Sequence, residues 1–185
     1  MSAAPLRRPE GLTVTLTAMR RRHLRSVLRI EALVYPRPWS LSLFLSELGL
    51  RATRAYVVAR VGPGVVGYAG LLLAAGDGHI TTVAVDPVWH RQGIATRMIL
   101  ALARTGVAKG CTSLTLEVRV SNTGAQALYR RFGFVPAGIR KGYYQETNED
   151  ALVMWAHDVD VPGYAERLDA IEASVSGTTV LEGEL

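Results

Sequence analysis

Residues 85–100 read "VDPVWHRQGIATRMIL" and join a proline-marked turn to the start of an apolar pattern with helical spacing. A helix N-terminus leaves backbone N–H groups without intrahelical partners and carries about half a positive elementary charge. Gly93 lets a ligand approach the backbone closely, and Arg91 adds charge. The junction therefore predicts a phosphate site on the amides of residues 91–96. A plain turn, in which the glycine only relieves crowding, is the alternative.

Length and composition predict a single globular domain. The chain has 185 residues, of which 49% are hydrophobic and 20% charged. Its longest nearly uninterrupted apolar run, residues 65–75, is shorter than the roughly 20 residues that a spanning helix needs. The first 12 residues lack the apolar core of a signal peptide, and the one cysteine has no internal partner for a disulfide. We therefore expect a cytoplasmic protein without a membrane anchor.

Charge is distributed unevenly along the chain. Residues 1–157 hold 20 lysines and arginines against 9 acidic residues, a net charge of +11, whereas residues 158–185 hold 1 against 7, a net charge of −6. The basic part fits either solvated arginine-rich helix faces or a phosphate-rich partner. We expect residues 159–185 to form an acidic C-terminal extension, partly disordered or with one short helix, after a domain that spans residues 1–158.

Periodicity on both sides of the junction predicts an α/β fold. Alternating apolar segments joined by glycine-containing turns precede it, which favours an antiparallel meander, and a helix then separates the last of these segments from the next, which favours parallel pairing. The expected order is β-α-α-β-β-β-α-β-α-β-β, a mixed and mostly antiparallel sheet of about seven strands flanked by helices. The expected strands lie near residues 12–16, 54–61, 65–75, 79–87, 112–120, 134–144 and 149–159.

Two further stretches make the prediction more specific. "TTVAVDPVWHRQGIATRMI" (81–99), followed by "LTLEVRVSNTGAQALYRRFGF" (114–134), resembles the acetyl-CoA-binding core of the GNAT superfamily of N-acetyltransferases. With "GYYQETNEDALVM" (142–154), it resembles the branch of bacterial ribosomal-protein-alanine N-acetyltransferases. The resemblance covers residues 12 to about 158 and implies a single GNAT-like domain with a splayed sheet.

The resemblance implies that acetyl-CoA is the cosubstrate. The pantetheine arm would enter between two splayed strands and pair with the main chain of Val83, Ala84 and Val85. Asn122 would contact the same arm, although an ordinary helix cap is also a sufficient role for it. His90 stands where the family usually has Gln or Arg, which leaves one side-chain contact to phosphate open. The pyrophosphate would lie on Arg91, Gln92, Gly93, Ile94, Ala95 and Thr96.

The resemblance also implies two catalytic groups. Glu117 would accept a proton from the amine, through water or with a pKa raised by partial burial, because an ordinary glutamate is a weak base. Tyr129 would return a proton to the leaving thiolate, and the main chain near Ala84 would offer an N–H to the thioester oxygen. The alternatives are a surface pair between Glu117 and Arg119, and a core aromatic role for Tyr129.

The expected acceptor site has aromatic walls. Tyr35 and Trp39 would form one wall, and Tyr143 and Tyr144 the other, which suits an extended peptide N-terminus. Alternatively, Trp39 anchors its loop to the core. The histidines show no metal-ligand spacing, and we expect no metal.

The predicted function is transfer of an acetyl group to a protein N-terminal α-amine, implied by resemblance to be the alanine of a small-subunit ribosomal protein. A small-molecule amine or lysine acetyltransferase is the alternative enzyme, and a non-catalytic acyl-CoA sensor is the alternative of another class. We expect no direct readout of nucleic acid and no membrane partner, and both a monomer and a weak dimer stay open.

Overall fold

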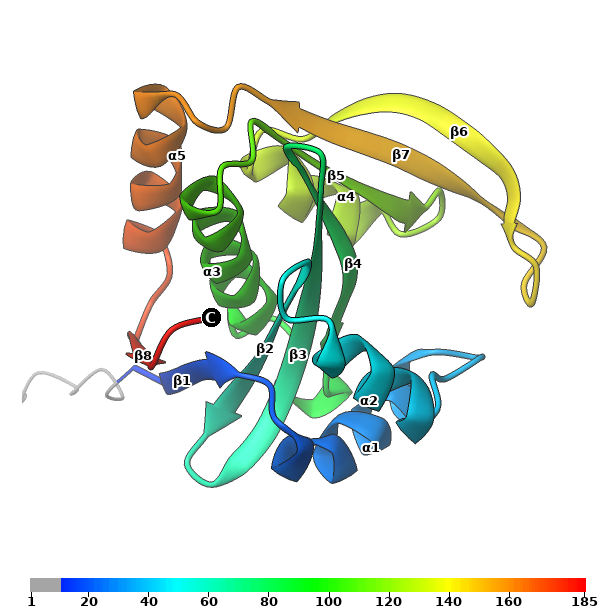
Figure 1. Cartoon of the computed structure of the whole chain (residues 1–185), viewed down its shortest axis with the longest axis vertical. Coiled ribbons are helices and arrows are strands. Elements are labelled where there is room, and N and C mark those ends of the chain that lie inside the picture. The colour runs from blue at the N-terminus through cyan, green and yellow to red at the C-terminus, as the bar shows by residue number, and fades with distance from the viewer. Residues whose placement is uncertain (1–10) are drawn as a thin grey trace, which may run out of the picture.

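The computed structural model describes residues 11–185 (Figure 1). Two single-turn 3₁₀ helices, Arg21–His23 and Pro87–Trp89, accompany the main elements. In chain order these are β1 (Thr13–Ala18), α1 (Leu24–Val34), α2 (Leu41–Gly49), β2 (Arg54–Val61), β3 (Gly64–Ala74), β4 (Asp77–Val85), α3 (Ile94–Ala108), β5 (Ser113–Arg119), α4 (Thr123–Arg131), β6 (Val135–Tyr144), β7 (Glu149–His157), α5 (Pro162–Ala173) and β8 (Thr178–Glu182).

All strands join one sheet in the order β6-β7-β5-β4-β3-β2-β1-β8. The pairs β4–β5 and β1–β8 are parallel, and the others are antiparallel. The predicted mixed, mostly antiparallel α/β fold is therefore confirmed, with eight strands in place of about seven. The predicted helix–loop–helix is also present, and Ser40 caps α2 by accepting a hydrogen bond from the Leu43 amide at 3.2 Å.

The C-terminal extension is more ordered than its sequence indicates. The prediction of one short helix agrees with α5, but the expected partial disorder is wrong, because β8 pairs along β1 from Thr13↔Thr178 to Thr17↔Glu182. Without β8, the outer edge of β1 would leave a row of unpaired backbone groups, and a β-branched segment can satisfy them. The division of the chain at residue 158 stays a prediction.

Helices cover both faces of the sheet. The larger cluster of buried side chains joins one face to α3, α4 and α5, and the smaller cluster joins the other face to α1 and α2. Figure 1 shows α3 and α5 side by side, with α1 and α2 apart from them. On β5, burial alternates as expected, with Leu114, Leu116 and Val118 facing α3. Val120, at the end of the expected strand 112–120, lies beyond β5 and is exposed.

The fork between β4 and β5 positions the site. Their pairing ends at His79↔Thr115, although β4 continues to Val85 and β5 to Arg119. In Figure 1 the two strands run in different directions beyond this point. A β-bulge just after the last pair leaves Thr81 without a partner on β3, and a bulge bends the strand that carries it. The predicted splay is therefore present in the chain itself.

Candidate active site

The turn before α3 has the geometry expected of an anion site. Arg91 and Gly93 both adopt positive φ, 62° and 73°. The Arg97 amide donates to the Gly93 carbonyl at 3.1 Å and closes the first turn of α3, so the amides of residues 94–96 have no intrahelical acceptor. A Cβ on Gly93 would lie 2.8 Å from Arg97 Nη1, which explains the glycine. These features fit a phosphate held by main-chain amides.

His90 is held by the strand before the turn. Its Nε2 lies 3.0 Å from the Val85 carbonyl oxygen, so the imidazole donates to β4. Asp86 starts the 3₁₀ turn between them by accepting from the Val88 amide at 3.2 Å. Arg29 of α1 contacts this carboxylate at 2.7 Å, and the pair lowers the Asp86 pKa below its usual range. Helix α1 therefore fixes the end of β4.

The free edge of β4 carries fewer main-chain groups than predicted. The Asp86 amide donates to the Val66 carbonyl of β3 at 2.9 Å. Because the main-chain N–H and C=O groups of successive residues point to opposite sides of a strand, those of Ala84 also face β3. The main-chain groups of Val83 and Val85 face the fork. The prediction that Ala84 supplies a main-chain N–H is therefore wrong. The carbonyl of Val83 accepts from the Tyr35 hydroxyl at 3.1 Å, which leaves the amides of Val83 and Val85 as the donors facing the fork.

Glu117 lies at the fork and is tied to β4. Its Oε2 lies 2.5 Å from His79 Nε2, and its Oε1 lies 3.2 Å from Arg140 Nη1 of β6. The His79 hydrogen bond, helped by the charge of Arg140, lowers the pKa of Glu117 although burial opposes the shift. Of the two expected ways for Glu117 to act as a base, the raised pKa is therefore wrong, and the relay through water stays a prediction. The alternative pairing with Arg119 is also wrong, because Arg119 pairs with Glu146 and Glu149. Because the ionised carboxylate only accepts, His79 Nε2 donates this hydrogen bond.

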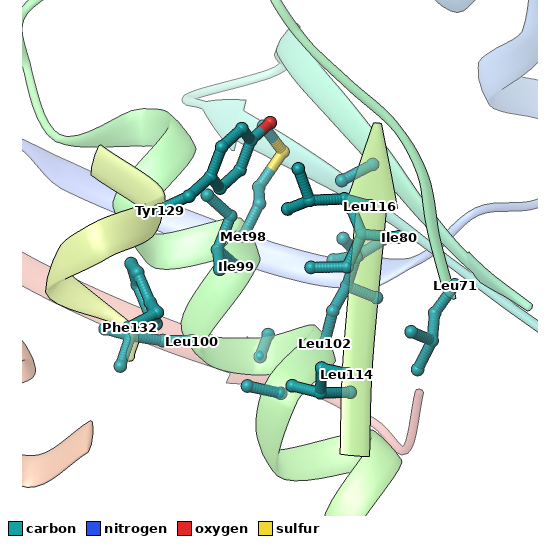
Figure 2. Close-up of a cluster of buried hydrophobic side chains, with 14 of the residues drawn as sticks. Leu71, Ile80, Met98, Ile99, Leu100, Leu102, Leu114, Leu116, Tyr129 and Phe132 are labelled. Atoms are coloured by element: carbon teal, nitrogen blue, oxygen red, sulfur yellow. The ribbon is translucent and has the colours of Figure 1, made fainter. Parts of the chain in front are cut away.

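Tyr129 reaches the fork from the opposite face of the sheet. Figure 2 shows its ring against Met98 at the edge of the buried cluster, with the hydroxyl directed away from the other labelled side chains. Burial raises the Tyr129 pKa, and the phenols of Tyr35 and Tyr144 raise it further. The three phenols therefore lie close enough to interact electrostatically, although Tyr35 belongs to the α1 side.

The two tyrosines of the predicted acceptor wall end β6. Their rings stand edge to face, with centroids 5.1 Å apart, and Tyr143 is 45% exposed. The Arg119 guanidinium lies 3.9 Å above the Tyr144 ring, and burial raises the pKa of that phenol to about 12. Arg119 also contacts Glu146 at 2.8 Å and Glu149 at 3.4 Å. One arginine on β5 therefore fixes the hairpin that carries both rings.

The loop that carries the opposite wall is anchored from beneath. Trp39 packs against Phe44 at 5.4 Å between ring centroids, and its amide donates to Glu31 Oε1 at 2.8 Å. Burial raises the pKa of Glu31. The anchoring role considered for Trp39 is therefore present, and its contact with a peptide stays a prediction. Tyr35, from the same loop, lies at the fork.

Asn122 has the helix-cap geometry that the sequence predicts. Its Oδ1 accepts from the Ala125 amide at 3.1 Å and starts α4, which carries Tyr129. Gln126 Nε2 donates to the carbonyls of Arg119 and Val120 at 3.1 and 3.0 Å, and so fastens α4 to the end of β5. The contact of Asn122 with a cofactor stays a prediction.

Sequence reasoning missed three side chains at or beneath the site. His79 and Arg140 pair with Glu117, and the buried Arg97 lies under the phosphate turn. The available signal for His79 was its position, a basic residue just before the place where the two strands were predicted to separate. The pairing itself depends on the parallel register of β4 and β5, which periodicity does not reveal.

Other chemistries find little support in the described residues. No group of three metal-ligating side chains occurs within residues 11–185. Cys111 is buried, and burial raises the pKa of its thiol, which disfavours the nucleophilic thiolate. Over the same residues, no helix is both long and apolar enough to cross a bilayer.

Comparisons with known proteins identify similar chains and a similar fold. The family model described as "Acetyltransferase (GNAT) family" matches residues 24–134. The chain is 35% identical over 150 residues to "N-alpha-acetyltransferase RimI" of Mycobacterium tuberculosis, covering 76% of this chain and 90% of that one. It is 32% identical over 142 residues to "[Ribosomal protein bS18]-alanine N-acetyltransferase" of Escherichia coli K12, covering 76% and 95%. A crystal structure of the ribosomal-protein-S18-alanine N-acetyltransferase from Escherichia coli superposes with a TM-score of 0.72 at 29% identity, covering 78% and 94%.

Proposed function

The chain belongs to the GNAT family of acetyltransferases, and from that premise we propose that it transfers an acetyl group from acetyl-CoA to the N-terminal α-amine of a protein. The observation that carries the proposal is the β4–β5 fork. It brings the Glu117–His79 pair, the Tyr129 phenol and the amides before α3 to one region of the sheet. Acetyl transfer needs a proton acceptor, a proton donor and an anion site in that arrangement.

The donor side binds acetyl-CoA through the main chain. We propose that the amides of residues 91–96 hold the pyrophosphate, and that Arg91 adds positive charge at the turn. The Val83 and Val85 amides face the fork and would bond the pantetheine arm. One of them would also donate to the thioester oxygen in place of Ala84. Asn122 would meet the arm from the end of α4.

The acceptor side removes a proton from the amine. A peptide α-amine has a pKa near 8, so about a tenth is neutral at pH 7. Glu117 alone is a poor base because its pKa is lowered. We propose that it orients the His79 ring through their hydrogen bond, so that Nδ1 accepts the proton directly or through one water. Arg140 holds the other carboxylate oxygen in place.

Tyr129 donates to the departing sulfur. Its raised pKa keeps the phenol protonated at neutral pH, so the proton is available. A thiol has an ordinary pKa near 8.5, so complete transfer from this phenol before the C–S bond breaks is uphill. The phenol therefore stabilises the departing thiolate by donating a hydrogen bond to it.

The acceptor class follows from the walls of the fork and from the relatives. Tyr143 and Tyr144 offer a rigid, half-buried aromatic wall to an extended chain. Two matched relatives are named for α-amines or for the alanine of ribosomal protein bS18, and we propose the N-terminal alanine of such a ribosomal protein as the substrate. The cytoplasm is the setting in which that substrate is made.

The test is release of free thiol from acetyl-CoA across an acceptor panel. The panel contains peptides with free N-termini beginning with Ala, Ser, Met or Gly, the same peptides blocked but containing lysine, and several polyamines and aminoglycosides. We expect turnover with free N-termini and the fastest rate with Ala. Turnover only with lysine or small amines would replace the acceptor class, and silence together with tight CoA binding would favour an acyl-CoA sensor.

A further inference from the structure

Arg97 is a buried arginine beneath the phosphate turn. It is 1% exposed, and its guanidinium makes three hydrogen bonds that join distant parts of the chain. Nη1 donates to the Gln92 carbonyl of the turn at 3.1 Å. Nε donates to Thr179 Oγ1 at 2.9 Å and Nη2 to the Ser176 carbonyl at 2.6 Å, both in the C-terminal extension. The extension therefore reaches the turn through one side chain.

The charge of Arg97 is unusual for its place. Within residues 11–185, none of its contacts is an ion pair, and burying a charge without an opposite charge is costly. The residue also lies in the first turn of α3, where a positive charge meets the positive end of the helix dipole. Both costs fall when an anion binds at the same helix end. The buried charge of Arg97 therefore indicates that this residue helps the N-terminus of α3 to bind an anion.

The turn transmits this charge outward. The Gln92 carbonyl, which accepts from Arg97, and the Gly93 N–H belong to the same peptide unit. All described peptide bonds are trans, so the two groups point in opposite directions and the Gly93 N–H points away from the guanidinium. A hydrogen bond to the carbonyl polarises the peptide and strengthens its N–H as a donor. Gly93 also packs on the extension, since a Cβ there would lie 2.9 Å from Val175 Cγ1. The extension thus supports the turn by contact and by charge.

We propose that the C-terminal extension, acting through Arg97, positions and polarises the turn that binds the pyrophosphate of CoA. Arg97 is a positioning residue that touches no substrate. Ser176 and Thr179 hold its guanidinium. The ion pairs of the extension lie elsewhere, since Asp169 and Glu172 pair with Arg104, and Glu182 pairs with Arg60. The inference rests on the proposed function only in taking CoA as the ligand.

The experiment measures dissociation constants of the full chain by calorimetry for three probes: CoA, pantetheine and inorganic pyrophosphate. R97M removes the charge and the three hydrogen bonds while keeping most of the volume, and T179V removes only one acceptor. R104M is the matched control, because Arg104 also joins α3 to the extension but lies seven residues further along the helix. Circular dichroism and melting curves check that each variant folds.

R97M should raise the dissociation constants of CoA and pyrophosphate by roughly tenfold, the worth of one charge-assisted hydrogen bond. T179V should raise them about threefold on the same scale. Pantetheine binding should stay unchanged in both, and R104M should bind all three probes like the parent. In kinetics, the acetyl-CoA KM should rise in R97M while kcat at saturation and the peptide KM stay constant.

Unchanged CoA binding in a folded R97M would overturn the proposal. An equal loss of affinity for CoA and pantetheine would also overturn it, because the effect would then lie outside the phosphate turn. If the parent binds pyrophosphate but not CoA, the proposed function fails while the R97M effect on pyrophosphate still decides the role of Arg97. If the parent binds neither, both proposals fail.

Discussion

Replacing Gly93 by alanine tests the phosphate turn at its tightest point. The residue has a φ of 73°, a conformation that costs a side chain about 1–2 kcal/mol. Its new Cβ would also lie 2.8 Å from Arg97 Nη1 and 2.9 Å from Val175 Cγ1. Both contacts are too short, so Arg97 must leave the Gln92 carbonyl. Loss of that charge-assisted hydrogen bond costs about 1.5–3 kcal/mol more.

G110A separates the two costs. Gly110 follows the other end of α3 with a φ of 87°, and among the described residues no atom beyond its two chain neighbours lies within 4 Å of a Cβ built there. It should therefore show the backbone cost alone. For a chain of this length, about 1 kcal/mol lowers Tm by about 2–4 °C, so we expect a loss of about 5 °C in G110A and about 10 °C in G93A.

Thermal melts and CoA titrations together complete the assay. G93A should weaken CoA binding at least about tenfold, because the amides that face the pyrophosphate move with the displaced turn. G110A should bind CoA like the parent. If G93A matched G110A in Tm and kept the parent's CoA affinity, the reasoning on this turn would be refuted, and the glycine would only relieve crowding.

Three further predictions concern the fork and the pH dependence of the fold. E117Q should lower kcat by about 100-fold and leave CoA binding intact. If the amide oxygen of the glutamine accepts from His79, its NH₂ group faces the Arg140 guanidinium, and two donors then meet. Steady-state rates and calorimetry check this. Y129F should lower kcat by about 10- to 100-fold at nearly unchanged Tm, because the buried ring stays and only the proton donor is lost. The folded-state pKa values of Asp86 and Glu117 are lowered, so their stabilisation is present above the ordinary carboxyl range, near pH 4, and is lost as pH falls toward the folded values. Melts from pH 7 to 3 should show this loss, and D86N should reduce it.

Local patterns were sufficient for the elements but not for their long-range pairing. The turn before α3 could be predicted, because Gly93 and the helical spacing after it are local features. The strand at β8 was missed, because "TTVLE" is short and its stability comes from the free edge of β1, more than 160 residues away. A segment of this kind has no independent reason to be a strand, and its structure is decided by tertiary context.

The same distinction applies to the site. Glu117 and Tyr129 lie within motifs that fix their strand and helix, so their approximate places followed from the sequence. The pKa of Glu117 did not, because its direction depends on His79, 38 residues earlier, and on Arg140. Ala84 was misjudged for a related reason. The direction of its main chain depends on the pairing of β4 with β3, and such pairing alternates residue by residue.

The fork also explains how a base and an acid on opposite faces of one sheet can serve one reaction. In a paired sheet, neighbouring strands lie about 4.8 Å apart and their main chains fill the space between the faces. Glu117 faces away from α3, whereas Tyr129 approaches from the α3 side. Only where β4 and β5 separate can both groups reach the same reacting atoms. Tyr35, from the α1 side, already donates to the Val83 carbonyl at this point, so groups from both sides of the sheet meet at the fork before any substrate arrives.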